Sequence, residues 1–264
     1  MVDIDAVFKA YDVRGLVPEQ LDAELCGRIG AAFAKFVKSD DDAVERVLIG
    51  QDMRPSGPEL VAAFAEGVRS QGLDTVEIGL ASTDLLYFAS GSLGAPGAMF
   101  TASHNPAGYN GIKFCLGGAR PVGDESGLAL IKEDARGELP PVGTPGTNSQ
   151  MDLLDAFVQH VHSFVDVDAL RPLKVVADVA NGMGGLVVPA AFAGSDPIVQ
   201  LESESKIEID LKMVVDDLLP LALEAAAAEN EEEAVWFQML VDLLNVQALD
   251  RLYVESDITK EPVS

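Results

Sequence analysis

The sequence predicts an α/β layer fold for the first part of the chain. Residues 46–50 and 75–79 are short apolar runs with the length of buried strands, and a polar loop and a helical segment follow each of them. Strands that alternate with helices are typical of a sheet covered by helices, in which ligand-binding loops lie at the carboxyl ends of strands. A chain of 264 residues is long enough for one or two such cores.

The helices expected in this region follow from the spacing of apolar residues. Residues 19–38 form an amphipathic stretch, and a second helix begins near Pro58, where Ser56 is a candidate N-cap. A third run of helical character covers residues 85–90. The apolar positions that define one face of the first helix are Leu21, Leu25, Ile29, Phe33 and Phe36.

A domain boundary is predicted near residue 147. Residues 124–136 have the pattern of a modest helix, and residues 137–146, rich in Pro and Gly, are typical of a linker. A helix is then expected over residues 151–164. The first domain is therefore expected to span residues 1–147.

The residues after this boundary divide into two parts of different composition. A strand over 173–178 and a helix over 186–193 continue the α/β pattern as a partial second domain over residues 148–194. Residues 195–264 contain 17 Asp and Glu against 4 Lys and Arg, so this acidic tail carries 13 of the 25 net negative charges. Its apolar runs 211–219 and 235–244 predict two helices that need a surface to cover, either the strands of the second domain or another chain. Self-association through the tail is therefore one hypothesis.

Charge and composition argue against several classes of partner. A net charge of −25 disfavours nucleic acid and anionic membrane surfaces, because both select clustered Lys and Arg. No apolar run approaches the length of a membrane span, and the first five residues lack the basic start of a signal peptide, so a cytoplasmic protein is expected. Cys26 and Cys115 have no metal-ligand spacing and are expected to be reduced, buried thiols.

The most evident chemistry lies in one short loop. Residues 101–106, Thr-Ala-Ser-His-Asn-Pro, separate an apolar run from an apolar–polar alternation, which predicts a strand–loop–strand unit. The hydroxyl of Ser103 becomes a nucleophile if a base takes its proton or cations stabilise its charge, and His104 and Lys113 are nearby candidates. Two alternatives stay open: a surface turn whose Ser103 and Asn105 bond only the local backbone, and a serine hydrolase, which the missing nucleophile-elbow pattern disfavours.

Three blocks of the sequence, in this order, resemble one known family. They are residues 8–15 (Phe-Lys-Ala-Tyr-Asp-Val-Arg-Gly), residues 50–56 (Gly-Gln-Asp-Met-Arg-Pro-Ser) and residues 103–113, which contain Ser-His-Asn-Pro and Tyr-Asn-Gly-Ile-Lys. Together they resemble the phosphohexomutases, the phosphomannomutase/phosphoglucomutase family, over about residues 1–194. The resemblance implies a three-layer α/β/α domain with a mixed sheet, whose Ser103 loop carries a phosphoserine, followed by part of a second α/β domain.

The resemblance also implies roles for individual residues. Ser103 would carry the phosphoryl group, Lys113 would act as acid and base beside it, and His104 and Arg14 would stabilise it. Mg²⁺ is the implied cofactor, and it would bind Ser103 through an oxygen of the attached phosphate. The residues expected to bind substrate or phosphate are Tyr11, Arg14, Asn105 and Arg54.

The activity implied is the reversible transfer of phosphate between O1 and O6 of a hexose phosphate, through phospho-Ser103 and a hexose 1,6-bisphosphate. This sequence departs from the family pattern, because it contains no Asp-Gly-Asp-Gly-Asp-Arg loop for Mg²⁺ and no recognisable sugar-selecting or distal-phosphate loop. Turnover by this chain alone is therefore in question. The alternative hypothesis is a truncated, non-catalytic module that binds a phosphosugar or serves assembly.

Overall fold

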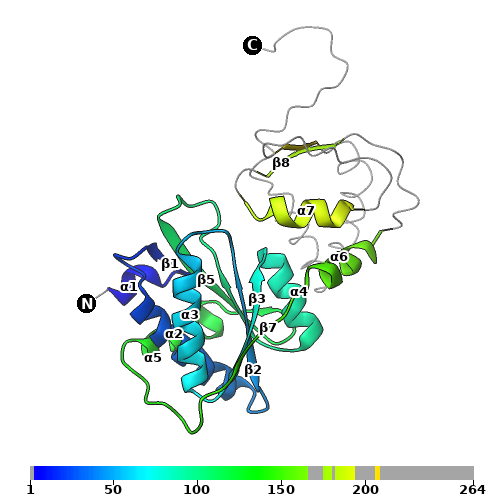
Figure 1. Cartoon of the computed structure of the whole chain (residues 1–264). Coiled ribbons are helices and arrows are strands. Elements are labelled where there is room, and N and C mark those ends of the chain that lie inside the picture. Colours follow the sequence, from blue (N-terminus) through cyan, green and yellow to red (C-terminus); the bar gives the residue numbers. More distant parts are fainter. Residues whose placement is uncertain (1–2, 166–174, 180–181, 194–205, 209–264) are drawn as a thin grey trace. The chain divides into compact units, whose positions relative to one another are not determined.

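A computed structural model describes residues 3–165, 175–179, 182–193 and 206–208. It divides into two compact units, residues 1–161 and 162–264. The first unit is built on a seven-stranded sheet of order β1-β5-β4-β2-β3-β7, with β6 paired to β5 (Figure 1). The strands are β1 (Val13–Leu16), β2 (Arg46–Gln51), β3 (Asp74–Leu80), β4 (Gly97–Phe100), β5 (Tyr109–Leu116), β6 (Arg120–Pro121) and β7 (Asn148–Gln150).

The sheet is mixed, and helices cover both of its faces. Strands β2, β3, β4 and β7 run parallel, whereas β5 is antiparallel to β4, β1 and β6. Helices α2 and α3 pack together over one face with α5, and α4 packs against β2 and β4 (Figure 1). The three-layer α/β/α domain expected from the sequence is therefore confirmed. The helices are α1 (Ile4–Val7), α2 (Ala23–Asp40), α3 (Gly57–Ser70), α4 (Thr83–Leu93), the 3₁₀ turn η1 (Asp124–Ser126), α5 (Leu128–Ala135) and α6 (Leu154–His162).

Aromatic side chains fill the main core between the sheet and the α2/α3 layer. The ring of Phe33 from α2 lies 4.7 Å from that of Phe114 in β5, and Phe64 from α3 meets Phe100 of β4 edge to face at 5.4 Å. Helices α2 and α3 can approach this closely because Gly30 has no side chain. A Cβ atom there would lie 2.2 Å from the carbonyl oxygen of Phe64.

The parallel strands bring three polar loops to one edge of the sheet. Gln51 at the end of β2 is in register with Phe100 of β4 and with Leu80 of β3. The loops that begin at residues 52, 81 and 101 therefore start side by side, as the α/β pattern predicts. Strand β5 begins at the same edge. The end of β1 also lies there, because the N–H of Val17, which follows β1, donates to the carbonyl of Gly108 (2.9 Å).

The first unit continues beyond the boundary predicted at residue 147. Strand β7 extends the sheet by pairing with β3, with Asn148 in register with Thr75. Helix α6 follows and buries Phe157, whose ring lies 5.7 Å from that of Phe88 in α4. The three residues of β7 are polar and exposed, so no hydrophobic pattern marks them as a strand.

The second unit is described in part. Strand β8 (Val175–Asp178) pairs antiparallel with β9 (Lys206–Glu208), and helix α7 (Gly184–Phe192) lies between them in sequence, close to the strand and helix predicted there. The helices expected over 211–219 and 235–244 fall outside the described residues. Within the part of the chain that the structure describes, no helix is long and apolar enough to span a membrane.

Both cysteines are free and buried, as predicted. Burial raises the pKa of the Cys115 thiol to about 11, although hydrogen bonds with Ser90 and Gly97 oppose the shift. Burial also raises the pKa of Cys26, further still. Neither thiol is therefore a thiolate near neutral pH.

Candidate active site

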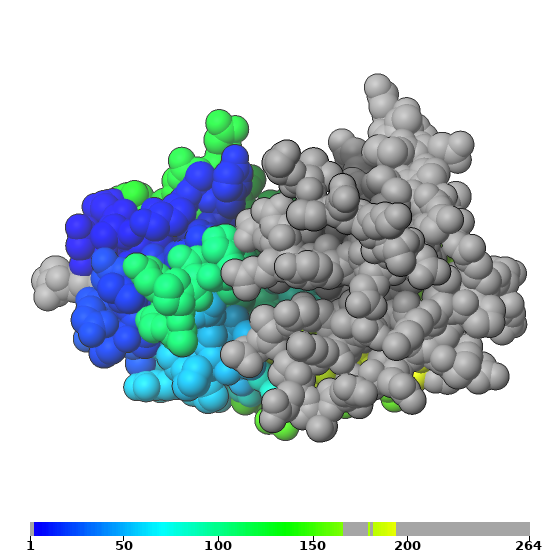
Figure 2. Space-filling model, turned by 90° about the horizontal axis from the view of Figure 1, so that it is seen from above, coloured from blue at the N-terminus to red at the C-terminus, as the bar shows by residue number. Residues whose placement is uncertain are grey.

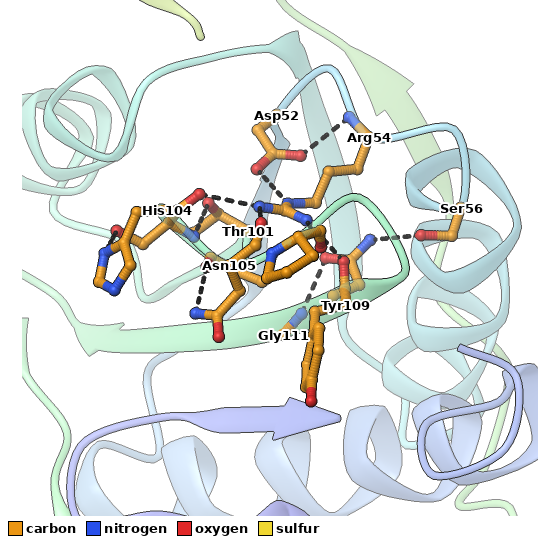
Figure 3. A network of polar contacts seen from close by, with 12 residues as sticks. Asp52, Arg54, Ser56, Thr101, His104, Asn105, Tyr109 and Gly111 are labelled. Atoms are coloured by element: carbon orange, nitrogen blue, oxygen red, sulfur yellow. Dashed lines mark hydrogen bonds and ion pairs between the residues drawn. The ribbon is translucent and has the colours of Figure 1, made fainter. Parts of the chain in front are cut away.

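The loop between β4 and β5 holds Ser103 in an unusual backbone conformation. Its φ angle is +52°, in the left-handed region that residues with a side chain seldom adopt. The N–H of Ser103 donates to the hydroxyl of Thr101 (3.0 Å), and both the N–H and the side-chain amide of Asn105 donate to the carbonyl of Ala102 (3.0 and 2.8 Å; Figure 3). The loop is thus a defined tight turn with Ser103 at its exposed tip.

The serine hydroxyl is exposed and lies next to an imidazole. Oγ of Ser103 is 3.4 Å from Nδ1 of His104, at the long limit of a hydrogen bond. Among the described residues, Ser103 is the one hydrogen-bond partner of that ring, so no third group orients the imidazole as a catalytic triad requires. This geometry does not favour the serine hydrolase alternative.

Arg54 binds the backbone carbonyls of the loop from its buried side. Its Nη1 donates to the carbonyls of Pro106 (2.9 Å) and Tyr109 (2.8 Å), and its Nη2 donates to those of Ser103 and Asn105 (both 2.8 Å; Figure 3). The remaining donor, Nε–H, is engaged by Asp52 (3.2 Å). A guanidinium has five N–H donors, and all five are used within the protein. In this structure, no N–H of Arg54 is left free for the phosphate that Arg54 is expected to bind.

Asp52 fixes the orientation of this arginine. One carboxylate oxygen accepts the backbone N–H of Arg54 (3.0 Å), and the other accepts its Nε–H. Both side chains are about 6% exposed, so the pair is buried beneath the loop. Loss of either partner would leave an unpaired buried charge, which typically costs about 3–5 kcal/mol.

The base of the loop is closed by Asn110 and Gly111. The buried side chain of Asn110 donates to Oγ of Ser56 (2.9 Å) and accepts from the N–H of Gly111 (2.8 Å). Ser56 stands at the N-cap position of α3, as predicted, but its hydroxyl makes no capping hydrogen bond to the helix. The hydroxyl is instead committed to Asn110, which links the helix to the loop.

Two cationic side chains share a face of the sheet beside this loop. Arg14 of β1 is in register with Gly111 of β5, and Lys113 lies two residues further along β5. Their neighbours Val13 and Ile112 are buried in the main core, and side chains alternate along a strand, so Arg14 and Lys113 lie on the opposite face. Strand pairing thus places both predicted cations on one face of β1 and β5, the strands that reach the edge of the sheet at which the Ser103 loop lies.

Arg14 uses only part of its hydrogen-bonding capacity. It forms an ion pair with Asp12, its side chain is 30% exposed, and its Nε is buried without a hydrogen-bond partner among the described residues. Arg14 thus combines a structural ion pair with one buried N–H that no described residue accepts. Tyr11, the remaining predicted residue, is 80% exposed and packs near Gly123.

Asp52, Thr101 and Asn110 belong to this site but were not assigned a role from the sequence. Asp52 stands two residues before Arg54, a spacing at which a carboxylate can bond the backbone and side chain of the arginine in a turn. The Asp-x-Arg spacing is therefore the sequence feature that indicates this contact. No local spacing indicates the hydrogen bond of Asn110, because its partner Ser56 lies 54 residues away.

The described residues contain no group of three or more His, Cys, Asp or Glu side chains that could hold a metal ion. Asp12 and Asp52 are both engaged by arginines. The donors seen around Ser103 therefore do not by themselves fit a Mg²⁺ site.

Comparison with known proteins places this geometry in one family. Residues 5–138 match the model of phosphoglucomutase/phosphomannomutase, alpha/beta/alpha domain I. The chain is 38% identical over 190 residues to a phosphomannomutase of Salmonella typhimurium and 39% identical over 184 residues to phosphohexose mutases of Xanthomonas campestris. These matches cover 70% and 69% of this chain but 41% and 40% of the relatives, so the chain spans about two fifths of their length.

Solved structures give the same result for the fold. A phosphoglucomutase/phosphomannomutase family protein of Burkholderia thailandensis superposes with a TM-score of 0.61 at 35% identity, over 73% of this chain and 42% of that chain. A phosphoglucomutase of Paramecium, parafusin, superposes with a TM-score of 0.62 at 16% identity, over 75% and 42%, which shows the shared fold. On the family-model match together with these relatives, the chain belongs to the phosphoglucomutase/phosphomannomutase family.

Proposed function

We propose that this chain supplies the phosphoryl-carrying part of a phosphohexomutase site, with Ser103 as the residue that accepts and donates the phosphoryl group. The observation that carries the proposal is the exposed hydroxyl of Ser103 at the tip of a loop whose backbone is held on both sides. Phosphoryl transfer demands alignment and cationic stabilisation more than covalent chemistry. A hydroxyl on a fixed loop supplies the alignment, and Arg14 and Lys113, on neighbouring strands of the same sheet, are the proposed cations.

In the proposed reaction, Oγ of Ser103 attacks one phosphorus of a hexose 1,6-bisphosphate. The bond between that phosphorus and the sugar oxygen breaks as the Oγ–P bond forms, and the serine proton passes through Lys113 to the departing sugar oxygen. The reverse step transfers the phosphoryl group from Ser103 to O1 or O6 of a hexose monophosphate. The sum of the two steps exchanges phosphate between O1 and O6.

The neighbouring residues have distinct proposed roles. Lys113 acts as acid and base for the serine oxygen, and Arg14, whose side chain is 30% exposed, offers its permanent charge to the transferring phosphate. His104 stabilises the seryl oxygen from 3.4 Å. Asn105 and Tyr11 are proposed to contact the substrate from the loop and from the exposed segment before β1.

The Mg²⁺ expected from the family has no set of ligands among the described residues. The proposed substrates, hexose phosphate and hexose 1,6-bisphosphate, are supported by the relatives named phosphomannomutase and phosphohexose mutases. The choice between mannose and glucose stays open.

A labelling experiment tests the proposal. Purified protein is incubated with glucose 1,6-bisphosphate, with and without Mg²⁺, and analysed by intact mass and peptide mapping. We expect one phosphoryl group on Ser103 and none in Ser103→Ala, with Ser92→Ala, which alters an exposed hydroxyl on α4, as a matched control that labels normally. A wild-type protein that is folded and stays unlabelled would contradict the proposal.

A non-catalytic module is the second candidate function. It is favoured by the engagement of both described carboxylates near the loop, Asp12 and Asp52, by arginines of the same chain. Such a module would bind hexose phosphate, as measured by calorimetry, without labelling of Ser103 or conversion of hexose 1-phosphate to the 6-phosphate. Labelling of Ser103 would exclude it.

A further inference from the structure

We infer that Arg54 is a positioning residue for phosphoryl transfer, which fixes the backbone of the Ser103 loop and thereby the direction of Oγ. This inference deepens the proposed function of Ser103 and rests on it. The supporting observation is the convergence of four loop carbonyls, spread over residues 103–109, on one guanidinium from the neighbouring β2–α3 loop.

The contacts of Arg54 reach the backbone of the serine itself. The carbonyl of Ser103 accepts from Nη2 of Arg54 (2.8 Å), and its N–H donates to Thr101 (3.0 Å). Both peptide groups of the residue are therefore held. A left-handed conformation at a residue with a side chain persists when surrounding bonds impose it, and here those bonds come from Arg54 and Thr101.

An arginine suits this position because of its shape. The planar fork offers five donors in fixed directions, whereas the single ammonium of a lysine offers three. Four carbonyls and one carboxylate use all five donors of Arg54, and the side chain is 6% exposed. A phosphate could bind Arg54 only by displacing the carbonyls that form the loop.

Arg54 therefore affects the rate of transfer rather than the affinity for the phosphosugar. A misplacement of reacting groups by about 1 Å can cost on the order of 100-fold in rate. A residue that binds phosphate directly would, in contrast, change the concentration of substrate needed for half-maximal rate. This difference separates the two roles experimentally.

The test compares the wild type with Arg54→Lys and with Arg120→Lys as the matched control. Arg120 is an exposed arginine of β6 whose partner is Asp40, remote from the loop. The rate of Ser103 phosphorylation is measured against glucose 1,6-bisphosphate concentration, and backbone amide hydrogen exchange is followed over residues 101–111. We expect Arg54→Lys to lower the maximal rate on the order of 100-fold, with an unchanged half-saturating concentration and faster exchange confined to the loop.

Other results would overturn the inference. A raised half-saturating concentration with an unchanged maximal rate would identify Arg54 as a phosphate ligand. A phosphorylation rate and a hydrogen-exchange rate equal to those of the wild type in Arg54→Lys would show that the contacts of Arg54 are not needed to fix the loop. If Arg54→Lys does not fold, Asp52→Asn keeps the arginine but replaces one oxygen that orients it. That variant should show a smaller loss of maximal rate at the same half-saturating concentration, and an unchanged rate would count against the inference.

The experiment distinguishes a wrong role for Ser103 from a wrong role for Arg54. If the wild type is not labelled, the phosphoryl-carrying role of Ser103 is wrong, and the hydrogen-exchange comparison alone decides whether Arg54 fixes the loop. Faster exchange in the loop of Arg54→Lys would then support the structural part of the inference. Unchanged exchange would overturn it.

Discussion

Gly111 shows how one residue without a side chain allows the site to form. It lies in β5 between β1 and the start of the Ser103 loop, and a Cβ atom there would lie 2.3 Å from the carbonyl oxygen of Val13 and 2.8 Å from that of Thr101. Both obstacles are backbone atoms, one in β1 and one in the residue that follows β4 and bonds to Gly111, so they cannot move aside cheaply. We expect Gly111→Ala to lower the free energy of unfolding by about 1–3 kcal/mol or more, as overpacking does.

Urea denaturation would measure this effect, with Gly91→Ala as the matched control. Gly91 lies in helix α4 with nothing within 4 Å of its Cβ position, so alanine there should stabilise the protein by up to about 1 kcal/mol. The opposite signs separate a steric requirement from a general effect of replacing glycine. Equal effects of the two substitutions would refute the steric interpretation.

The positions of single residues could be predicted where sequence neighbours determine them. Ser103, His104 and Asn105 lie in one loop, as predicted, because Pro106 and the flanking strands mark that loop in the sequence. The role of Arg54 could not be predicted, because its acceptors Pro106 and Tyr109 lie 52 and 55 residues away and are backbone carbonyls that any sequence could supply. Burial of its guanidinium, rather than its charge, decides what it does.

At the scale of elements, an ionic cluster ties helix α1 to helix α5. The carboxylate of Asp5 accepts from both Nη atoms of Arg136 (3.1 and 2.7 Å) and pairs with Lys132 (2.8 Å). Hydrogen bonds from Arg136, and then from Lys132, lower the pKa of Asp5 from 3.8 to about 2. A carboxylate with a lowered folded-state pKa stabilises the protein above its unfolded-state pKa, and this stabilisation is lost as pH falls through the folded-state value.

Asp5→Asn should therefore lower the melting temperature at pH 6, and the difference from wild type should shrink between about pH 4 and pH 2. Salt should reduce the difference as well, because the cluster is exposed. Asp42→Asn, in an exposed turn, is the matched control and should differ little from wild type throughout. A difference between Asp5→Asn and wild type that is independent of pH would show that the carboxylate does not act through its charge.

The elements themselves were predictable where apolar periodicity is strong. The helix expected over residues 19–38 is α2, which begins instead at Ala23 because Asp22 caps it by accepting the N–H of Leu25 (2.8 Å). Strand β7 was not predictable, since its three residues are all polar and exposed and gain their conformation from pairing with β3. The linker expected between domains ends in this strand, which shifts the end of the first unit to Val161.

At the scale of the whole molecule, the structure predicts that the first unit needs β7 and α6 for its stability. A chain ending at Val161 keeps both the pairing of β7 with β3 and the buried Phe157, whereas a chain ending at Thr147 loses them. Full burial of a side chain such as Phe157 contributes about 1.5–3 kcal/mol. In a domain of this size, the loss of this burial alone corresponds to a fall in melting temperature of about 3–10 °C for the shorter chain.

Thermal unfolding followed by circular dichroism would compare the two chains, and Phe157→Ala in the longer chain would separate the contribution of the buried ring from that of the strand. We expect the order of melting temperatures to be the chain ending at Val161, then its Phe157→Ala variant, then the chain ending at Thr147. The last step in that order reports β7 together with the rest of α6, because the variant retains both while losing only the ring. Equal melting temperatures for the two chains would restore the boundary at residue 147 and make β7 and α6 part of the connection to the following unit.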